Sequence, residues 1–514
     1  MKKALLRQSL LYTLELRTDD IAVLHFFISQ NALWRIDEMV EKHKHTNDVR
    51  LGQAAVFASA ILLFIAVLIF LPDTVSWPAR STIAIMVFGL VLWAFAPIPI
   101  ELTSVIVLVL LIVMKPVEMD IVLSGFASPA VFLIIGGMMM AVGVNQTLLV
   151  QRMTYFLLSL MGKSAKGIYI GFFILMQVQA FFIPATAVRA SLMLPILTNI
   201  IEETGVDEKS NFNKLMYIGA AFGGNVSGVV VLTAAIGNIL AVEILRLYEG
   251  VSISYLQWFI YAAPMWFLLV LATMYIVWKC YPPESYSFDK LQVEMKGKYD
   301  ALGALSIDEK KCIGILVLTI LIWFTESWHG YHPTFGALLA VILMALPVTG
   351  FAAWKRMLDI NFGMVLLIGA TLSLGYSLIE SGAIDLLEVL VSPQFVLDVF
   401  SNPWLAIPIT IIVSQIYHLG VTNVSTAVIT LMPVLISLSV QSGVDPVVIV
   451  LASAISMLLG FLLIVETMPN VVVHSTGRVS QKDFLWPGLW LTLASIAIMI
   501  VIAYTYWRWI GFWP

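Results

Sequence analysis

Two short breaks in otherwise apolar sequence carry the groups best suited to binding an ion. The first lies in Phe181-Phe-Ile-Pro-Ala-Thr-Ala-Val-Arg-Ala-Ser-Leu-Met-Leu-Pro195. There Pro184 ends one helix, and the Thr186 hydroxyl can cap the N-terminus of the next helix. The free N–H groups and the dipole of a helix N-terminus favour an anion. The alternative is an ordinary turn between two helices.

The second break lies in His418-Leu-Gly-Val-Thr-Asn-Val-Ser-Thr-Ala-Val-Ile-Thr-Leu-Met-Pro433. Gly420 ends the first helix here, and Asn423 or Ser425 can cap the second. Because both breaks fall midway through apolar segments, we expect each to be the tip of a re-entrant hairpin, and two unrelated turns are the alternative.

Each hairpin is followed by a long helix with a polar interruption of its own. The interruptions read Gly223-Gly-Asn-Val-Ser-Gly228 with Leu232-Thr-Ala-Ala-Ile-Gly-Asn238, and Leu463-Ile-Val-Glu-Thr-Met-Pro-Asn470. Gly and Pro unwind a membrane helix and expose carbonyl oxygens that can hold a cation. For the glycines of the first interruption, close packing against a neighbouring helix is an equal alternative.

Two ionisable side chains, Arg189 and Glu466, lie in these segments and are functional candidates because charge is costly at membrane depth. Arg189 can hold a substrate carboxylate in bidentate fashion, while pairing with Glu466 and extension to the membrane edge are the alternatives. Glu466 is a candidate cation ligand whose protonation would make coupling pH-sensitive, with protons replacing at least one sodium ion. A buried, hydrogen-bonded structural role is the alternative for Glu466.

The composition indicates that these groups sit in a membrane. Hydrophobic residues make up 60% of the 514 residues and charged residues 12%, against about half and a quarter in soluble domains. Many stretches without Asp, Glu, Lys or Arg reach the about 20 residues that span a bilayer. They are 51–72, 81–100, 121–151, 215–242, 251–278, 327–354, 399–444, 446–465 and 484–507. We therefore predict an all-α polytopic membrane protein.

Other classes fit the sequence less well. The net charge of −4 disfavours nucleic-acid binding, and Cys280 and Cys312 offer neither a disulfide framework nor metal-ligand spacing. The seven His residues are scattered and no HExxH or GxSxG motif occurs, so an integral-membrane enzyme is disfavoured. A channel is disfavoured because paired re-entrant hairpins suit alternating access better.

The distribution of charges predicts a topology. We expect about eleven crossings and two hairpins. The crossings lie near 53–71, 82–97, 100–116, 127–147, 213–247, 256–279, 312–328, 333–349, 362–380, 446–474 and 485–509, and the hairpins at 167–198 and 403–438. Of the 28 Lys and Arg residues, 23 then fall on the cytoplasmic side, as the positive-inside rule requires. Residues 1–52 would form a cytoplasmic helical extension, with the N-terminus cytoplasmic and the C-terminus outside.

Residues 53–280 hold a first transmembrane helix and then one repeat, and residues 312–514 look like a second copy of that repeat, with a charged cytoplasmic linker at 281–311 between them. Landmark residues recur at offsets of 230 to 238 residues. The pairs are Trp93 and Trp323, Gly136 and Gly369, Pro195 and Pro433, and Asn238 and Asn470. A near-constant offset indicates duplication, and five crossings per copy would place the second copy upside down. Inverted repeats with broken helices are typical of transporters with a site near mid-membrane.

One further segment is Val465-Glu-Thr-Met-Pro-Asn-Val-Val-Val-His-Ser-Thr-Gly-Arg-Val-Ser480. It resembles the Gly-Thr-Pro-Pro-Asn, apolar run and Gly-x-Val-Ser pattern of the divalent-anion/sodium symporter (DASS) family of the ion transporter superfamily. Residues 186–195 resemble the first hairpin of that family, and Gly125-Phe-Ala-Ser-Pro-Ala130 is also similar. The resemblance covers about residues 55–510.

The resemblance implies a scaffold and a mobile domain that moves as an elevator, usually in a homodimer. It implies a secondary transporter of small anions, di- or tricarboxylates or sulfate, coupled to sodium or protons, with no cofactor beyond a possible sodium ion. A metalloid exporter or a sodium/proton antiporter of the same superfamily is the alternative. The resemblance places Ala185, Thr186, Thr422, Asn423, Thr467 and Pro469 near the anion, and the breaks add Ser425, Asn470 and Arg189. It places Ala187, Gly224 and Val424 near the cations, and the interruptions add Asn238 and Glu466.

The sequence departs from the family pattern at three points. Ala185-Thr-Ala187 stands where the family has Ser-Asn-Thr, Ala234–Asn238 lacks a Pro-Pro pair, and Glu466 replaces a glycine. The first change removes an amide and a hydroxyl, which predicts a weakened or absent sodium site at the first hairpin. The sequence leaves open which anion is carried and whether the mode is symport or exchange.

Overall fold

A computed structural model of the chain describes residues 52–384, 386, 393–421 and 423–513. These residues form helices and contain no strand, as the composition predicts. The chain divides into two units, Met1–Ser59 and Ala60–Pro514. Apart from Gly52, the predicted extension at 1–52 lies outside the described residues, and so does the candidate substrate residue Thr422.

Apolar helices of membrane-spanning length confirm that the chain is a polytopic membrane protein. Eight helices among the described residues are long and apolar enough to cross a bilayer. They are Gly52–Phe70, Trp77–Phe95, Met119–Val144, Tyr255–Cys280, Phe362–Glu380, Pro403–Gly420, Val424–Gln441 and Gln481–Trp507. Three further apolar helices are shorter, namely Ile100–Met114, Pro333–Ala345 and Pro446–Leu458.

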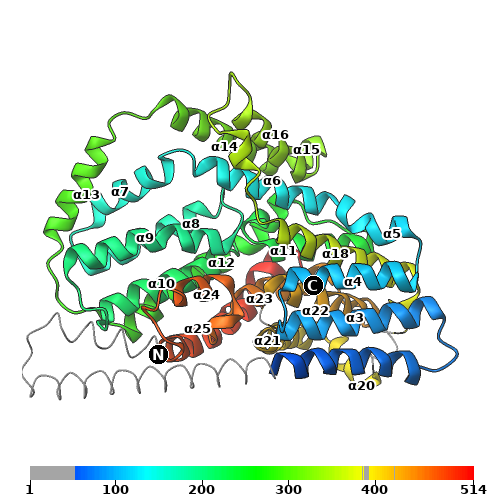
Figure 1. Cartoon of the computed structure of the whole chain (residues 1–514). Coiled ribbons are helices and arrows are strands. Elements are labelled where there is room, and N and C mark those ends of the chain that lie inside the picture. The colour runs from blue at the N-terminus through cyan, green and yellow to red at the C-terminus, as the bar shows by residue number, and fades with distance from the viewer. Residues whose placement is uncertain (1–51, 385, 387–392, 422, 514) are drawn as a thin grey trace, which may run out of the picture. The chain divides into compact units, whose positions relative to one another are not determined.

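Helices make up both halves of the chain (Figure 1). The first half contains α3 (Trp77–Phe95), α4 (Ile100–Met114), α5 (Met119–Ser124), α6 (Pro129–Val144), α7 (Leu149–Met161), α8 (Ala165–Gln179), α9 (Thr186–Thr204), α10 (Asn211–Ser227), α11 (Ile236–Glu249) and α12 (Tyr255–Cys280). The linker contains α13 (Asp289–Ala301). The second half contains α14 (Ile307–Phe324), α15 (Glu326–His329), α16 (Pro333–Ala345), α17 (Trp354–Met357), α18 (Phe362–Glu380), α20 (Gln394–Phe400), α21 (Pro403–Gly420), α22 (Val424–Gln441), α23 (Pro446–Leu458), α24 (Met468–His474) and α25 (Gln481–Ile502).

Both predicted hairpins are pairs of helices with a break between them, α8 with α9 and α21 with α22. Asn423 caps α22, because its Oδ1 accepts hydrogen bonds from the N–H groups of Ser425 (2.9 Å) and Thr426 (3.3 Å). The prediction that Thr186 caps α9 is wrong. The extended backbone ends at Ala185, so Thr186 is already helical and no side chain caps this helix.

The two polar interruptions fold alike. The predicted crossing at 213–247 divides into α10 and α11, and the one at 446–474 divides into α23 and α24. In each, an asparagine Nδ2 donates to carbonyl oxygens ten and seven residues earlier, which the break has freed from helical bonding. The acceptors are Gly228 (2.8 Å) and Val231 (3.3 Å) for Asn238, and Gly460 (3.1 Å) and Leu463 (3.0 Å) for Asn470.

The landmark tryptophans also make equivalent contacts in the two halves. Trp93 and Trp323 are buried, and their Nε1–H groups donate to the carbonyls of the first residues of α4 and α16, respectively. The acceptors are Ile100 at 3.3 Å and Pro333 at 2.8 Å. Helices α3, α4 and α18 share one hydrophobic core, and α18 also contributes Val365, Ile368 and Leu372 to a second, larger core.

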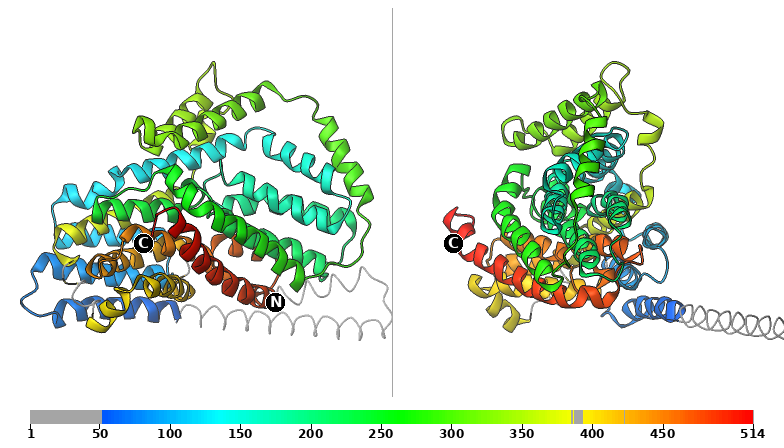
Figure 2. Two further views of the ribbon diagram at one scale, coloured as in Figure 1. Left: turned by 180° about the vertical axis from the view of Figure 1, so that it is seen from behind. Right: turned by 90° about the vertical axis from the view of Figure 1, so that its left-hand side faces the viewer.

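The sequence patterns did not predict helix α7, which falls between the predicted crossing at 127–147 and the predicted hairpin at 167–198, or helix α13 of the linker. The two helices lie side by side (Figures 1 and 2), and Gln292 Nε2 of α13 donates to the Ser159 carbonyl of α7 at 2.7 Å. Helix α7 is amphipathic, and α13 is largely polar but buries Leu291 and Met295, so neither is apolar enough to be identified as a membrane span from the sequence.

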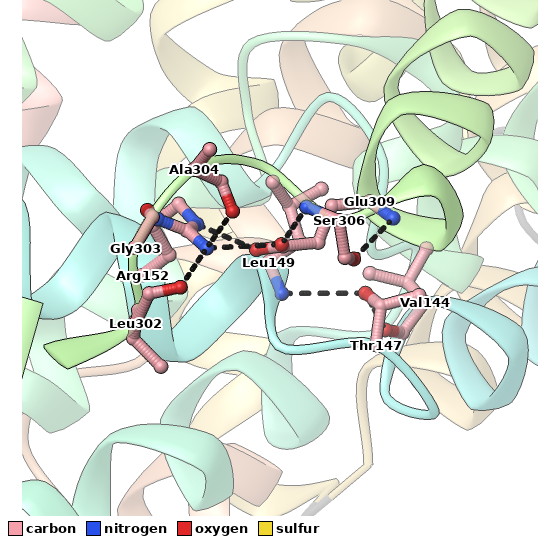
Figure 3. Close-up of polar contacts among 9 residues, drawn as sticks. All are labelled: Val144, Thr147, Leu149, Arg152, Leu302, Gly303, Ala304, Ser306 and Glu309. Carbon is pink, nitrogen blue, oxygen red and sulfur yellow. Dashed lines mark hydrogen bonds and ion pairs between the residues drawn. The ribbon is translucent and has the colours of Figure 1, made fainter.

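A buried ion pair joins this helix pair to the second half (Figure 3). Arg152 of α7 donates from Nε to Glu309 Oε1 (2.6 Å) and from Nη2 to Glu309 Oε2 (3.0 Å). The same guanidinium donates to the carbonyls of residues 302–304, just after α13. Hydrogen bonding to Arg152 lowers the pKa of Glu309 to about 2 from its ordinary 4.5.

Gly125, just after α5, lies against the backbone of α18. A Cβ placed on Gly125 would lie 2.2 Å from the Gly369 carbonyl oxygen and 2.3 Å from the Ser373 nitrogen. We expect Gly125→Ala to lower stability by about 3 kcal/mol, the upper end of the usual overpacking cost, because backbone cannot move aside. Gly297→Ala is the matched control, since a Cβ on exposed Gly297 of α13 meets open space and alanine favours a helix. Thermal unfolding of both variants in detergent tests this, and equal midpoints would contradict it.

Candidate functional site

A cavity of about 340 Å³ lies where the two hairpin tips meet the two helix breaks. The tips contribute residues 184–188 and 423–425, and the breaks contribute Asn225, residues 235–237, Leu458, Thr467 and Met468. The opposite wall consists of Ile100, Glu101, Met138, Ala141, Val142, residues 359–361 and Met364. The structure thus brings the two tips to one cavity, as the repeat pattern predicts.

Glycines allow the tips to approach their neighbours closely. A Cβ on Gly228 would lie 3.0 Å from Thr186 Cγ2, and a Cβ on Gly237 would lie 2.7 Å from Val424 Cγ1. For Gly228, the distance of 3.0 Å supports the alternative that this glycine allows close packing against a neighbouring segment. The same applies to Gly224, where a Cβ would lie 3.1 Å from a Pro469 side-chain carbon, so α10 and α24 pack closely there.

Four helices, α9, α11, α22 and α24, begin at the cavity. Their N-cap residues have extended backbones and line it. They are Ala185, Ala235, Asn423 and Thr467. The N–H groups of a first helical turn have no intrahelical partner and carry partial positive charge. The lining residues include no Lys, Arg or His, and the charged ones, Glu101 and Asp359, lie on the opposite wall. The groups at the cavity that carry positive partial charge are therefore the N–H groups of helix ends and of neutral polar side chains.

Five of the predicted substrate residues share this lining, namely Ala185, Thr186, Asn423, Ser425 and Thr467. The predicted cation residues Ala187 and Val424 line it as well. Thr467 is 2% exposed, and its Oγ1 has no hydrogen-bond partner among the described residues. A buried hydroxyl normally has a partner, so this group is suited to a bound ligand.

The predicted substrate residues Pro469 and Asn470 do not line the cavity. Asn470 instead accepts a hydrogen bond at its Oδ1 from Asn225 Nδ2 (3.1 Å), and Asn225 also donates to the Gly460 carbonyl (2.8 Å). Asn225 does line the cavity, although the sequence reasoning did not select it. The sequence does contain a signal for Asn225, because it is the residue with an amide side chain in the interruption Gly223-Gly-Asn-Val-Ser-Gly228.

The predicted cation residues Gly224, Asn238 and Glu466 also lie outside the lining. Glu466 is 2% exposed, and its Oε2 accepts hydrogen bonds from the N–H groups of Leu462 (2.8 Å) and Leu463 (3.0 Å). This geometry favours the structural alternative for Glu466, since the carboxylate holds the start of the break before α24.

Arg189 is fully buried and also lies outside the lining. Its hydrogen bonds go to Ser227, Ile183 and Ala234. In this structure, therefore, it neither pairs with Glu466 nor reaches the membrane edge, and it does not contact the space where an anion would sit.

Broken helices that meet at a cavity within a polytopic membrane protein are typical of secondary transporters. The family model described as the sodium:sulfate symporter transmembrane region matches residues 53–513, so the chain belongs to this family. This match confirms the resemblance to the divalent-anion/sodium symporters, and it makes the chain a transporter rather than an enzyme.

Individual relatives resemble the chain over most of its length. A sodium-dependent dicarboxylate transporter SdcS of Staphylococcus saprophyticus is 25% identical over 486 residues, which cover 90% of this chain and 92% of the relative. The protein of the same name from Staphylococcus aureus (strain USA300) is 26% identical over 489 residues, covering 90% and 93%. A membrane protein of Cupriavidus necator is 24% identical over 481 residues, covering 88% and 92%.

Proposed function

We propose that this chain is a secondary transporter of small di- or tricarboxylates or of sulfate-like anions, coupled to sodium or protons. The observation that carries the proposal is the convergence of four helix N-termini on one cavity that has no cationic side chain in its lining. Such a site offers N–H donors without a fixed counter-charge, which suits an anion that must bind and leave again. The names of the staphylococcal relatives support a dicarboxylate and sodium.

The same proposal includes the mechanism. The paired breaks, equivalent asparagine contacts and recurring landmarks support two inverted repeats, with the hairpin tips and broken helices moving as an elevator past a scaffold. A homodimer with cytoplasmic N-termini and external C-termini completes the proposal, in keeping with the family resemblance and the distribution of Lys and Arg. The assigned residues that line the cavity remain part of this proposal, namely Ala185, Thr186, Asn423, Ser425 and Thr467 for the anion and Ala187 and Val424 for the cations.

Uptake of radiolabelled anions into proteoliposomes tests the proposed function. Succinate, citrate and sulfate are offered with sodium or pH gradients imposed separately. We expect saturable uptake of at least one of them, competed by unlabelled anion and absent from protein-free liposomes. If none of the three is taken up or exchanged in either gradient, the proposed substrate class is wrong.

Glu466→Gln distinguishes the two coupling ions. If Glu466 carries a coupling proton, the variant is expected to lose the response to a pH gradient, because an amide does not exchange protons, while uptake driven by sodium persists. If the carboxylate only holds the backbone, a glutamine retains one acceptor oxygen for Leu462 and Leu463, and both responses stay at wild-type levels. The measurement is the uptake rate of the wild type and of Glu466→Gln at fixed membrane potential, with a pH gradient or a sodium gradient imposed.

A further inference from the structure

A groove with a volume of about 690 Å³ lies between α12 and α25 and shares no lining residue with the anion cavity. The two helices run side by side (Figure 2) and are joined toward both ends of their contact. Tyr281, which follows α12, donates its hydroxyl to the Asp483 carbonyl at 2.7 Å, and Trp507 Nε1 donates to the Tyr261 carbonyl at 2.9 Å. Between these contacts, the last turns of α12 and the first half of α25 line the groove.

Aromatic side chains form the body of the groove. Trp486 and Trp490 of α25 pack edge to face with their ring centroids 5.7 Å apart, and they are 59% and 49% exposed. Tyr275 on the α12 side is 63% exposed. The two tryptophans lie at the surface because another face of α25, which includes Phe484 and Leu491, is buried in the protein. Trp and Tyr are typical of the membrane–water interface, and an exposed apolar patch of this kind marks a binding surface for apolar groups.

Two lysines lie at one end of this aromatic surface. Lys279 lines the groove from the last turn of α12, and its Nζ lies 5.7 Å from the centroid of the Tyr275 ring. Lys482 is exposed and precedes Trp486 by four residues, so it lies one helical turn farther along the same face of α25. Neither lysine has an acidic partner among the ion pairs of the described residues. The predicted topology places this end of both helices at the cytoplasmic side of the membrane.

We propose that the groove binds an anionic phospholipid of the cytoplasmic leaflet. The phosphate lies between Lys279 and Lys482, and an acyl chain extends along the two tryptophans. A groove that is apolar along its length and positive at its cytoplasmic end is complementary to an apolar chain with a negative head group, and basic sites between membrane helices bind such head groups. Asp483, the carboxylate next to Lys482, is paired with Lys214 at 2.8 Å and is therefore not available to neutralise this end.

The charge distribution favours this occupant over two others. A phospholipid without net charge gains nothing from the two lysines, and a soluble anion has no chain to cover the tryptophans. The proposal does not rest on the proposed function, because it concerns the surface that α12 and α25 present to the membrane and not the transported anion.

Photolabelling of the purified full-length wild type locates the lipid. The probe is phosphatidylglycerol with a diazirine in one acyl chain, added to the protein in a neutral detergent and activated by light. We expect label in residues 275–280 and 486–494, the segments that line the groove. Unlabelled phosphatidylglycerol should prevent this labelling at concentrations at which phosphatidylcholine with the same chains does not.

Three outcomes of the labelling would overturn the proposal. Label spread evenly over exposed helices, or prevented equally well by phosphatidylcholine, shows only the lipid that surrounds any membrane protein. Unlabelled groove segments in a dimer indicate that a second copy of the chain covers the groove instead.

The double variant Lys279→Gln/Lys482→Gln tests the head-group contacts. Each lysine near an anionic head group contributes about fivefold in binding, so we expect the variant to bind phosphatidylglycerol about 25-fold more weakly and phosphatidylcholine as before. The measurement is the lipid concentration that gives half of the maximal rise in the thermal unfolding midpoint in detergent. Because both lysines are exposed, the variant should fold.

Lys290→Gln/Lys296→Gln is the matched control. It removes the same charge from exposed lysines of α13, which lie outside the groove, and it should bind both lipids like the wild type. If Lys279→Gln/Lys482→Gln binds phosphatidylglycerol as tightly as the wild type, or if the control loses as much affinity, the two lysines do not form a head-group site and the proposal is wrong.

Discussion

Asn423→Asp is expected to reduce anion uptake by about 100-fold while the protein stays folded. A hydrogen bond to a charged partner contributes about 1.5–3 kcal/mol, which corresponds to between about tenfold and more than hundredfold in binding. The aspartate replaces the amide donor of Asn423 by a negative charge that repels the substrate. It keeps the oxygen that accepts from the N–H groups of Ser425 and Thr426, and Asp is an equally good N-cap residue.

Asn402→Asp is the matched control for this change. Asn402 is the N-cap residue of α21, and its Oδ1 accepts a hydrogen bond from the Trp404 N–H at 3.0 Å, but it does not line the cavity. We expect this variant to transport like the wild type. Initial uptake rates at low substrate concentration, with thermal unfolding as a check of folding, compare the two. Uptake at the wild-type rate by a folded Asn423→Asp protein would contradict the assignment of Asn423 to the substrate site.

Glu309→Ala is expected to cause the largest loss of stability among the changes considered. The Glu309 side chain is 1% exposed and that of Arg152 is 9% exposed, so the substitution leaves a buried guanidinium without its carboxylate. Removing one partner of a buried ion pair costs about 3–5 kcal/mol. Glu309 also accepts from the Ser306 N–H at 2.8 Å, so the N-terminus of α14 loses a cap as well. The thermal unfolding midpoint in detergent measures the loss.

The same pair predicts a dependence of stability on pH. Because the folded-state pKa of Glu309 is about 2 and its ordinary value is 4.5, its contribution is complete above pH 4.5 and is lost as the pH falls toward 2. As the pH falls from 4.5 to 2, the free energy of unfolding should therefore decrease less for Glu309→Ala than for the wild type. Glu294→Ala on α13 is the control, since the Glu294 and Lys298 side chains are 42% and 36% exposed and such pairs contribute little. Equal midpoints for Glu309→Ala and Glu294→Ala at pH 7 would contradict the assignment.

The amino-acid sequence by itself determined the membrane class, the two hairpin breaks and the interrupted helices. These features are local. A long apolar run without charge spans a membrane wherever it packs, and Pro184 or Gly420 interrupts a helix through its own backbone. The cap at Asn423 is equally local, because its acceptor and donors lie within three residues. At Ala185 the local reasoning failed, because the helix begins at Thr186, one residue earlier than a Thr186 cap requires.

Only the tertiary structure decided which polar groups face the cavity and which hold the fold together. Asn225 meets Asn470 across 245 residues of chain, and Arg189 meets the Ala234 carbonyl across 45. Arg152 finds Glu309 across 157 residues, and nothing in either local sequence indicates the other. The physical reason is that a buried polar side chain bonds to whichever group packing places beside it, and packing depends on contacts between helices far apart in the sequence.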